Sequence, residues 1–401
     1  MKKEHNKRII ISLIIFFLVL VFFTLLVFFK EEEKSIEYID NLEFEFNAEV
    51  KISDIIKDLK GSLKSDYEID TTSIGKKEII IEYYDKRKKS KEKKCEISIV
   101  DSTKPKIIID DIVKIPQGSK IDLTETIPSG DDCDPNPKRR ILGDYNIDEL
   151  GDYHLIFEVE DFSGNVESKE FTLRIAKNET NQELVNTETK KFSEVINNYK
   201  KDNTQVGIDV SLWQGNIDWK RVKNAGCNFA FIRVGYQEDF GGKNVEDKYF
   251  KKNIEEAQRE GIKVGLYFYS YAINEEESKQ QAEWVLSKIE KNNIELPIAF
   301  DWESWNSFVK CKLSFFQLNN IANTFISEIE KGGFKASLYS SKNFLEKIWY
   351  KDKYENIWLA HYADETDYEG KYQYWQMSNT GSINGINGNV DINIFRDENG
   401  S

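Results

Sequence analysis

The sequence predicts an α/β protein in which an eight-stranded barrel follows two all-β segments and one apolar helix at the N-terminus. Three observations support this prediction. An apolar run follows the first basic residues, short alternating strand patterns fill residues 43–176, and strand-like and helix-like segments alternate from residue 205 onward. With 401 residues the chain is also too long for one ordinary domain.

The composition argues against several classes of function. The formal net charge is −14, and acidic residues surround the basic run Lys86–Lys89, so no nucleic-acid partner is expected. The cysteines lack the CxxC spacing of zinc sites, and neither a Walker loop nor a GxGxxG motif occurs. A Cys95–Cys133 or a Cys227–Cys311 bridge stays open outside the cell. Because the spacing requires neither bridge, we expect free thiols.

The N-terminus has the pattern of a membrane anchor. Residues 1–8 are basic, and the run Ile9–Phe29 is apolar except for Ser12 and Thr24. As a helix this run is roughly 30 Å long, enough to span a bilayer. The basic tail is expected in the cytoplasm and the acidic juxtamembrane segment, residues 30–42, outside. A cleaved signal peptide is the alternative, but no small-residue cleavage site follows the run, so we expect an uncleaved single-pass anchor.

Residues 43–176 have the alternating pattern of an all-β region, and an internal repeat divides them. Gly75 stands ten residues before Asp85, and Gly151 stands ten residues before Asp161 in the same strand context. The repeat predicts two β modules.

The module boundaries follow from the segments between the strands. Residues 101–107 and 161–165 resemble the bacterial immunoglobulin-like modules found in tandem on secreted wall proteins. This resemblance implies β-sandwich modules at 43–101 and 102–176, which we expect to act as spacers because no exposed aromatic cluster marks a sugar platform. The polar stretch 177–204 is typical of a linker.

Residues 205–396 are expected to form one α/β domain. Helical patterns cover Asp247–Glu260, Glu275–Lys291 and Leu313–Lys331, and the helices fade toward the C-terminus. Near-continuous apolar strands between helices indicate a parallel sheet, and eight of them suggest closure into a barrel. The eight predicted strands are Val206–Val210, Phe229–Val234, Lys263–Tyr269, Pro297–Asp301, Lys335–Tyr339, Ile357–Tyr362, Tyr372–Met377 and Val390–Ile392.

Four acidic residues fall where such a barrel carries its chemistry. Asp209 ends the first strand, Asp301 and Glu303 end the fourth, and Asp391 lies in the eighth, next to the first around the ring. In an extended strand Asp301 and Glu303 project to the same side, with their backbones roughly 6–7 Å apart. Because two negative charges at this spacing repel each other, the two carboxyls acquire different pKa values. One can then serve as a proton donor while the other stays ionised.

Aromatic residues gather at the same strand ends. A ring of aromatic faces around carboxylates is typical of a sugar-binding cleft rather than of a phosphate site. The candidate substrate contacts are Tyr269, Tyr339, Tyr362 and Trp375.

The order of these motifs resembles that of glycoside hydrolase family 25, the bacterial and phage muramidases often called Chalaropsis-type lysozymes. The resemblance covers essentially all of residues 205–395 and implies a modified TIM-like barrel with eight strands and about five helices. Many members carry His where Phe268 stands, which puts one minor substrate contact in doubt. The matching motifs are Gly207–Trp219, Phe231–Tyr236, Gly265–Ala272, Ala299–Glu303, Trp358–Tyr362, Tyr374–Gln376 and Val390–Asn393.

The resemblance also implies an activity and its residues. The expected reaction is hydrolysis of the β-1,4 bond between N-acetylmuramic acid and N-acetylglucosamine in peptidoglycan, without a cofactor. Glu303 would be the general acid. Asp301 would stay charged and either orient a substrate acetamido group that attacks the anomeric carbon or assist a water. Asp209 and Asp391 would control both electrostatically and bind sugar hydroxyls.

Two other functions remain open from the sequence. A catalytically silent wall-binding surface protein would not need paired acids, and a glycosidase with another glycan specificity cannot be told apart by its motifs. With the anchor, the preferred prediction is a lysozyme held on the outer face of a bacterial cell membrane, for wall turnover or local wall opening.

Overall fold

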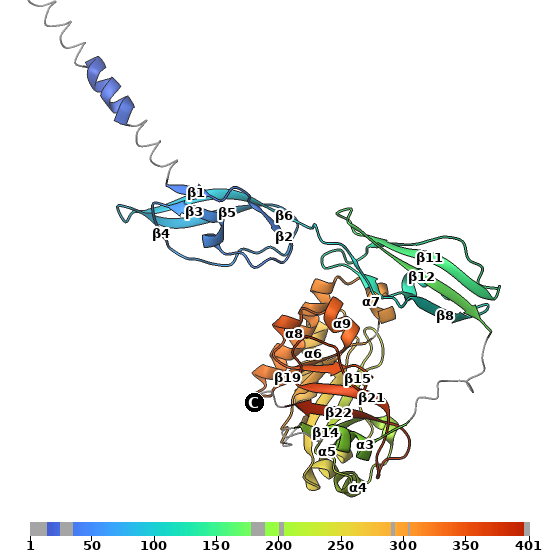
Figure 1. Cartoon of the computed structure of the whole chain (residues 1–401). Helices are drawn as coiled ribbons and strands as arrows, with labels where there is room; N and C mark the ends of the chain where they lie inside the picture. Colours follow the sequence, from blue (N-terminus) through green and yellow to red (C-terminus); the bar gives the residue numbers. More distant parts are fainter. Residues whose placement is uncertain are drawn as a thin grey trace, which may run out of the picture. The chain divides into compact units, whose positions relative to one another are not determined.

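The computed structural model describes residues 14–24, 35–177, 189–199, 204–289, 293–303 and 305–396. The chain divides into two compact units, Met1–Ser102 and Thr103–Ser401. The first unit holds one β module, and the second holds another β module and a closed eight-stranded barrel (Figure 1).

Part of the predicted anchor is described. Residues 14–24 are helical, whereas the rest of Ile9–Phe29 lies outside the described residues, as do residues 178–188 of the predicted linker. Within the described ranges, no helix combines the length and the hydropathy required to cross a membrane.

The first unit is built from strands and one 3₁₀ turn. β1 (Ile36–Tyr38) pairs antiparallel with β3 (Ile56–Leu59), and η1 (Ile52–Ile55) precedes β3. A second sheet has the order β2 (Glu43–Glu45), β6 (Ser90–Val100), β5 (Gly75–Asp85) and β4 (Gly61–Leu63). Alternate residues of β5 and β6 point into one core, which they share with the β1–β3 pair.

The β module of the second unit has a sheet in the order β8 (Ile112–Pro116), β12 (Val166–Ala176), β11 (Gly151–Glu160) and β10 (Lys138–Leu142). A short pair, β7 (Lys106–Ile107) with β9 (Ser129–Gly130), and the helix α2 (Leu123–Thr126) complete it. Its core includes the buried side chains of Leu155, Phe157 and Phe171.

The sequence repeat corresponds to one strand arrangement used twice. In each module the first strand of the four-stranded sheet runs parallel to the last, β2 with β6 and β8 with β12. The repeated glycines begin β5 and β11, both with positive φ. The repeated aspartates close matching turns, because Oδ1 of Asp85 accepts from the Lys89 N–H and Oδ1 of Asp161 from the Asn165 N–H, each at 2.9 Å. The immunoglobulin-like resemblance itself stays a prediction.

The barrel contains eight of the strands that follow. Its closed order is β14 (Thr204–Val210), β15 (Phe229–Gln237), β17 (Lys263–Tyr269), β18 (Ile298–Asp301), β19 (Ala336–Ser341), β20 (Ile357–Ala360), β21 (Tyr374–Ser382) and β22 (Val390–Arg396). Two short strands lie beside it, β13 (Lys190–Lys191) against β21 and β16 (Asn244–Glu246) against β15.

One part of the predicted topology is wrong. The first seven barrel strands are parallel, but β22 runs antiparallel to both of its neighbours, β14 and β21. Only the short segment 383–389 joins β21 to β22, too little for the crossover that a parallel strand needs. The start of β22, rather than its end, therefore lies level with the carboxyl ends of the other strands.

Helices surround the strands on the outside (Figure 1). The long helix α8 begins at a capping box in which Oγ of Ser314 accepts from the Gln317 N–H at 3.2 Å. The helices of the barrel domain are α3 (Phe192–Tyr199), α4 (Trp219–Asn224), α5 (Phe250–Arg259), α6 (Glu275–Ile289), α7 (Trp305–Cys311), α8 (Phe315–Lys331) and α9 (Lys342–Lys347), with 3₁₀ turns η2 (Leu212–Gln214) and η3 (Lys351–Lys353).

The period-two alternation of the strands separates two cores. Residues facing outward pack against the helices in the main core, whereas Phe229, Phe231, Trp358 and Tyr374 fill the barrel interior. The rings of Phe231 and Trp358 stack with centroids 4.2 Å apart. Gly207 makes room for this filling, because a Cβ there would lie 2.4 Å from the Phe229 carbonyl oxygen. These four aromatic side chains form an aromatic plug in the interior of the barrel.

Candidate active site

A cavity of about 210 Å³ opens above the aromatic plug. Its walls come from the carboxyl ends of the parallel strands, the start of β22 and the turn η2. The lining residues are Asp209, Ser211, Trp213, Gln214, Arg233, Tyr267, Tyr269, Asp301, Glu303, Tyr339, Trp358, Gln376 and Asp391.

The structure brings all four predicted acids together in this cavity. Asp209 stands opposite Asp391 in the β14–β22 pairing, and Asp301 stands beside Tyr269 in the β17–β18 pairing. Asp209 and Asp301 are buried, whereas Glu303 follows the end of β18 and is exposed at the mouth. Three separate stretches of the chain thus supply one acidic site.

A network of amides holds two of the acids. Nε2 of Gln376 donates to Oδ2 of Asp209 at 2.9 Å and to Oδ2 of Asp391 at 3.2 Å. Nδ2 of Asn393 also donates to Oδ2 of Asp209, at 2.7 Å, and Oδ1 of Asn393 accepts from the Trp358 indole at 2.7 Å. Neutral amide donors fix the carboxylates in place without adding charge to the site.

Tyrosines hold Gln376 in turn. Its Oε1 accepts from the hydroxyl of Tyr339 at 2.8 Å and from that of Tyr362 at 3.2 Å. Because Oε1 can only accept, these bonds orient Nε2 toward the two aspartates. Tyr339 and Tyr362 therefore act on the acids through one shared side chain.

The four carboxyl groups are all harder to ionise than usual. Burial is the largest cause in each case, and neighbouring carboxylates add to it for Asp301, Glu303 and Asp391. Burial raises the pKa of Asp209, although its amide partners work in the opposite direction. Burial and the nearby Asp209 raise the pKa of Asp391 to about 9. Asp391 therefore holds its proton around neutral pH.

The sequence analysis expects Asp301 to be ionised, whereas its surroundings in the structure favour the protonated form. Burial, followed by the negative charges of Glu303 and Asp209, raises its pKa well above the ordinary value, and Arg233 only partly opposes this. The free protein does not favour an ionised Asp301. Its Oδ1 is buried, and no hydrogen-bond partner for that atom exists among the residues that the structure describes. Such an atom points to a group that a ligand supplies.

Glu303 has the setting of a proton donor. Although its side chain reaches solvent, partial enclosure raises its pKa, Asp209 raises it further, and hydrogen bonding with Tyr339 lowers it. A carboxyl whose pKa is raised and that still reaches the mouth is suited to protonating a ligand oxygen.

The four predicted aromatic contacts do not all lie in the cavity. Tyr269 and Tyr339 line the cavity, and Tyr362, 54% exposed, stands at its rim through the bond to Gln376. The prediction is wrong for Trp375, which is fully buried in the outer core with its indole donating to the His361 carbonyl at 2.7 Å. Phe268 also faces outward, against Trp284 and Phe325, so it is no substrate contact either.

The sequence does not single out Gln376, which lines the cavity, or Asn393, which is fully buried and holds Asp209. Neither carries a charge, but the two-residue spacing from Tyr374 and from Asp391 places both inside the barrel. Trp213, 79% exposed, offers an aromatic face at the rim.

Arg233 was also missed, and among the described lining residues it is the single cation. The buried Asp247 holds it in place, because Oδ2 of Asp247 accepts from Nε of Arg233 at 2.9 Å and from the Leu212 N–H at 2.9 Å. Asp247 thereby fixes both a cationic wall of the cavity and the start of η2.

Comparisons with known proteins point to one family. Residues 208–386 match the profile described as "Glycosyl hydrolases family 25". Lysozyme M1 of Streptomyces globisporus is 31% identical over 202 residues, a match that covers 47% of this chain and 67% of that protein. The uncharacterized protein YegX of Escherichia coli K12 is 31% identical over 195 residues, covering 47% of this chain and 68% of YegX. A solved family 25 glycosyl hydrolase structure from Bacillus anthracis is 27% identical, covers 49% of this chain and 90% of its own, and gives a TM-score of 0.42.

Proposed function

The chain belongs to glycosyl hydrolase family 25 and is a glycoside hydrolase of the lysozyme type, and on this premise we propose that it cleaves the β-1,4 bond between N-acetylmuramic acid and N-acetylglucosamine. The observation that supports this most is the cavity itself. A solvent-accessible Glu303 with a raised pKa stands beside a buried Asp301, whose Oδ1 has no hydrogen-bond partner within the described part of the chain.

In the proposed reaction Glu303 is the general acid. Its proton passes to the glycosidic oxygen as the bond to the anomeric carbon breaks, which leaves a neutral leaving group. The enclosure of Glu303 raises the pKa of its carboxyl, which favours the protonated form that this step needs.

Asp301 is proposed to act on the acetamido group of the sugar. Its free Oδ1 would accept from the acetamido N–H, and the acetamido oxygen would attack the anomeric carbon. As positive charge develops on the acetamido group, an ionised Asp301 becomes favourable, although burial disfavours it in the free protein. Assistance to an attacking water is the alternative role for the same carboxyl.

Asp209 and Asp391 are proposed to bind sugar hydroxyls and to maintain the electrostatic balance of the site. Both are held by Gln376, so their positions are fixed before substrate binds. Tyr269, Tyr339 and Tyr362 would contact the sugar rings, and the exposed Trp213 would add a stacking face at the rim.

The test of the assignment is Glu303→Gln in the full chain. We expect the variant to release no measurable reducing sugar from purified peptidoglycan, while its circular dichroism and melting temperature match the unmodified protein. Retention of most of the activity would remove Glu303 from the chemistry.

Asp301→Asn should be nearly as damaging. An amide can occupy the same volume but cannot stabilise positive charge on the acetamido group, so we expect kcat to fall by about a hundredfold or more. A loss of only about twofold would exclude Asp301 from the reaction.

The glycan specificity is tested separately, by mass spectrometry of the fragments that the full chain releases. Reducing-end N-acetylmuramic acid is the expected result. Reducing-end N-acetylglucosamine, or cleavage of chitin oligomers instead, would show a different glycosidase specificity.

We further propose that Ile9–Phe29 anchors the enzyme in a bacterial cell membrane, with the later domains facing the wall. The support is the basic flank and the apolar run in the sequence. Such an anchor would confine cleavage to the wall nearby, as turnover or local opening requires. Fractionation tests it: the full chain should be found with membranes, and recovery from the medium without Met1–Phe29 would contradict the proposal.

A further inference from the structure

The β module of the second unit meets the barrel domain at the start of α8. The first N–H groups of a helix have no partner within it. Here the N–H of Phe315 donates to the Asp131 carbonyl at 2.8 Å, and the N–H of Phe316 donates to the Asp132 carbonyl at 3.2 Å. Two of the caps of α8 therefore come from the module rather than from the barrel domain.

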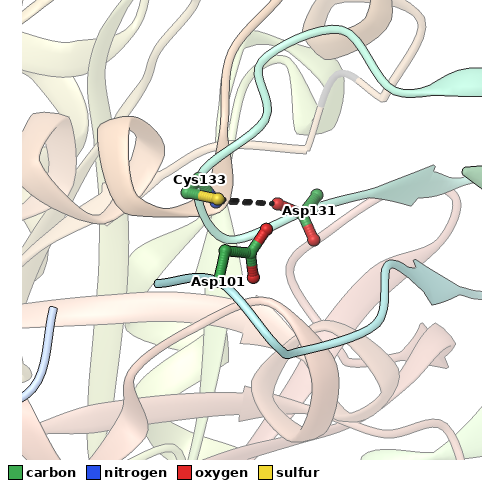
Figure 2. Close-up of side chains that lie close together, drawn as sticks. All are labelled: Asp101, Asp131 and Cys133. Carbon is green, nitrogen blue, oxygen red and sulfur yellow. Dashed lines mark hydrogen bonds between the residues drawn. The ribbon is translucent and has the colours of Figure 1, made fainter. Parts of the chain in front are cut away.

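The loop that supplies these carbonyls is itself well ordered by hydrogen bonds. Oδ1 of Asp131 accepts from the N–H groups of Cys133 at 2.9 Å and Asp134 at 2.8 Å. Figure 2 shows the Cys133 thiol turned toward the same oxygen, at 3.4 Å. This turn fixes the direction of the backbone carbonyls that face α8.

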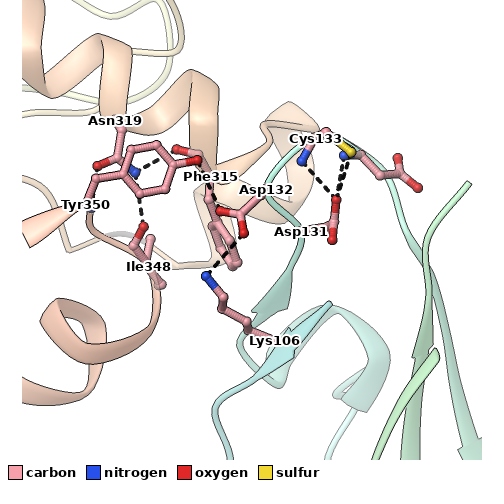
Figure 3. A network of polar contacts seen from close by, with 9 residues as sticks. Lys106, Asp131, Asp132, Cys133, Phe315, Asn319, Ile348 and Tyr350 are labelled. Atoms are coloured by element: carbon pink, nitrogen blue, oxygen red, sulfur yellow. Dashed lines mark hydrogen bonds and ion pairs between the residues drawn. The ribbon is translucent and has the colours of Figure 1, made fainter. Parts of the chain in front are cut away.

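Side chains reinforce the contact from both sides (Figure 3). Oδ1 of Asp132 accepts from the Tyr350 hydroxyl at 3.1 Å, and its Oδ2 pairs with Nζ of Lys106 at 3.3 Å. Nζ of Lys347 donates to the Ile107 carbonyl at 3.2 Å. Asn319 supports Tyr350 from within the barrel domain, since its Oδ1 accepts from the Tyr350 N–H at 2.8 Å.

A row of buried apolar side chains connects this contact to the segment after β18 that carries Glu303. Gly130 at the end of β9 lies against Phe315 and Phe308, and a Cβ at Gly130 would come within 2.8 Å and 3.0 Å of their rings. Phe308 and Phe315 stack with centroids 5.5 Å apart, and both are fully buried.

This row ends at Trp302, the residue between Asp301 and Glu303. Its ring meets Phe308 edge to face at 6.0 Å and Trp349 at 6.4 Å. The Trp349 indole donates to Oγ of Ser340, which follows Tyr339 in β19, at 2.8 Å. The outward-facing side chain of the catalytic strand end thus rests on aromatic rings that touch the module.

From these contacts we propose that the second β module is a positioning element of the active site, not a spacer: through Gly130, Phe308 and Trp302 it sets the place of Glu303. The proposal rests on the assignment of Glu303 as the acid. Gly130 is a positioning residue, since it acts on the reaction only through the rings that it supports.

The contact at Trp302 matters because Glu303 lies beyond the end of the strand. Among the described residues β18 stops at Asp301, so Glu303 is held by its hydrogen bonding with Tyr339 and by the position of its chain neighbour Trp302. A shift of about 1 Å in a reacting group can cost about a hundredfold in rate. Small changes at the module contact should therefore affect kcat strongly.

The test uses Gly130→Ala in the full chain, with Ser168→Thr as the matched control that adds one methyl group at an exposed position of the same module. We expect Gly130→Ala to lower kcat about tenfold, with KM changed by less than about twofold. Enclosure raises the pKa of the Glu303 carboxyl, so a less enclosed Glu303 should lose its proton at lower pH. The fall of kcat on the alkaline side of the pH profile should therefore begin at lower pH in this variant. Adding Phe315→Leu should make room and restore much of kcat.

Tyr350→Phe gives a second variant that removes one hydroxyl and adds no volume. It should lower kcat and shift the alkaline limb in the same direction, by less than Gly130→Ala. If Gly130→Ala fails to fold, Tyr350→Phe decides the question. Unchanged kcat and pH profiles in the folded variants, or a loss of kcat matched by a rise in KM, would overturn the proposal. An inactive wild type, or an active Glu303→Gln, would instead contradict the proposed function.

Discussion

Asp391 shows how one side chain links the charge of the site to the stability of the fold. Its pKa is about 9 in the folded chain, against about 3.9 in an unfolded one. Between these values the folded state binds the proton that the unfolded state releases, so this group makes the free energy of unfolding fall as pH rises.

Asp391→Asn should remove that dependence. The free energy of unfolding of the full chain should fall less steeply from about pH 4 to about pH 9 in the variant than in the wild type. At pH 8 the variant should be at least as stable as the wild type, although its activity is lost. Thermal unfolding of both proteins over this range measures the difference. Parallel curves would mean that Asp391 is not held protonated.

The sequence identified the acids of the site but not the amides that hold them. Asp209, Asp301, Glu303 and Asp391 stand out because charge is rare in apolar strands. Gln376 has no such signal, whereas the aromatic ring of its neighbour Trp375 is typical of a sugar contact. Alternation along β21 places only one of two adjacent residues inside the barrel, and Tyr374 already fixes which parity points inward.

At the scale of the element, strand positions were predictable and strand direction was not. β17 has the predicted bounds, and the other barrel strands agree within a few residues at most of their ends. An apolar run has the same composition in either direction, so the antiparallel course of β22 could be read only from the short connection before it. Asp391 stands near the start of β22, so in a parallel strand it would lie at the opposite end of the barrel from the other three acids.

Gly207 tests how tightly the barrel interior is filled. In Gly207→Ala the new methyl group would meet the Phe229 backbone oxygen, which cannot move aside as a side chain can. We expect a loss of about 1–3 kcal/mol in the free energy of unfolding, measured by denaturant titration. Lys263→Ala, at an exposed position that begins β17, is the control and should change little. Equal stability of both variants would show a looser interior.

At the scale of the whole chain, the two β modules share a strand order but not a role. Both carry the repeat that the sequence revealed, and both were expected to be spacers. Only the module of the second unit belongs to the same compact unit as the barrel. Its contacts use backbone carbonyls of Asp131 and Asp132 and the absence of a side chain at Gly130. Such features depend on the tertiary structure, which explains why the sequence did not predict them.

Deleting residues 35–102 from the full chain should therefore preserve the chemistry. We expect kcat on soluble peptidoglycan fragments to stay within about twofold of the wild-type value, because the site and its support lie in the second unit. Deleting residues 103–176 should instead abolish activity and lower the melting temperature of the barrel. Equal loss from both deletions would show that the first module also supports the site.

The antiparallel β22 has a consequence for the order of events during synthesis. It is the last strand of the barrel, and it must insert between the first strand, β14, and its predecessor β21. Asp391 reaches Asp209 only when this happens. A nascent chain that has already exposed Asp301 and Glu303 still has an open barrel, and such distant pairing forms late. We therefore expect the nascent hydrolase to be inactive and to gain its activity only when the last strand closes the barrel.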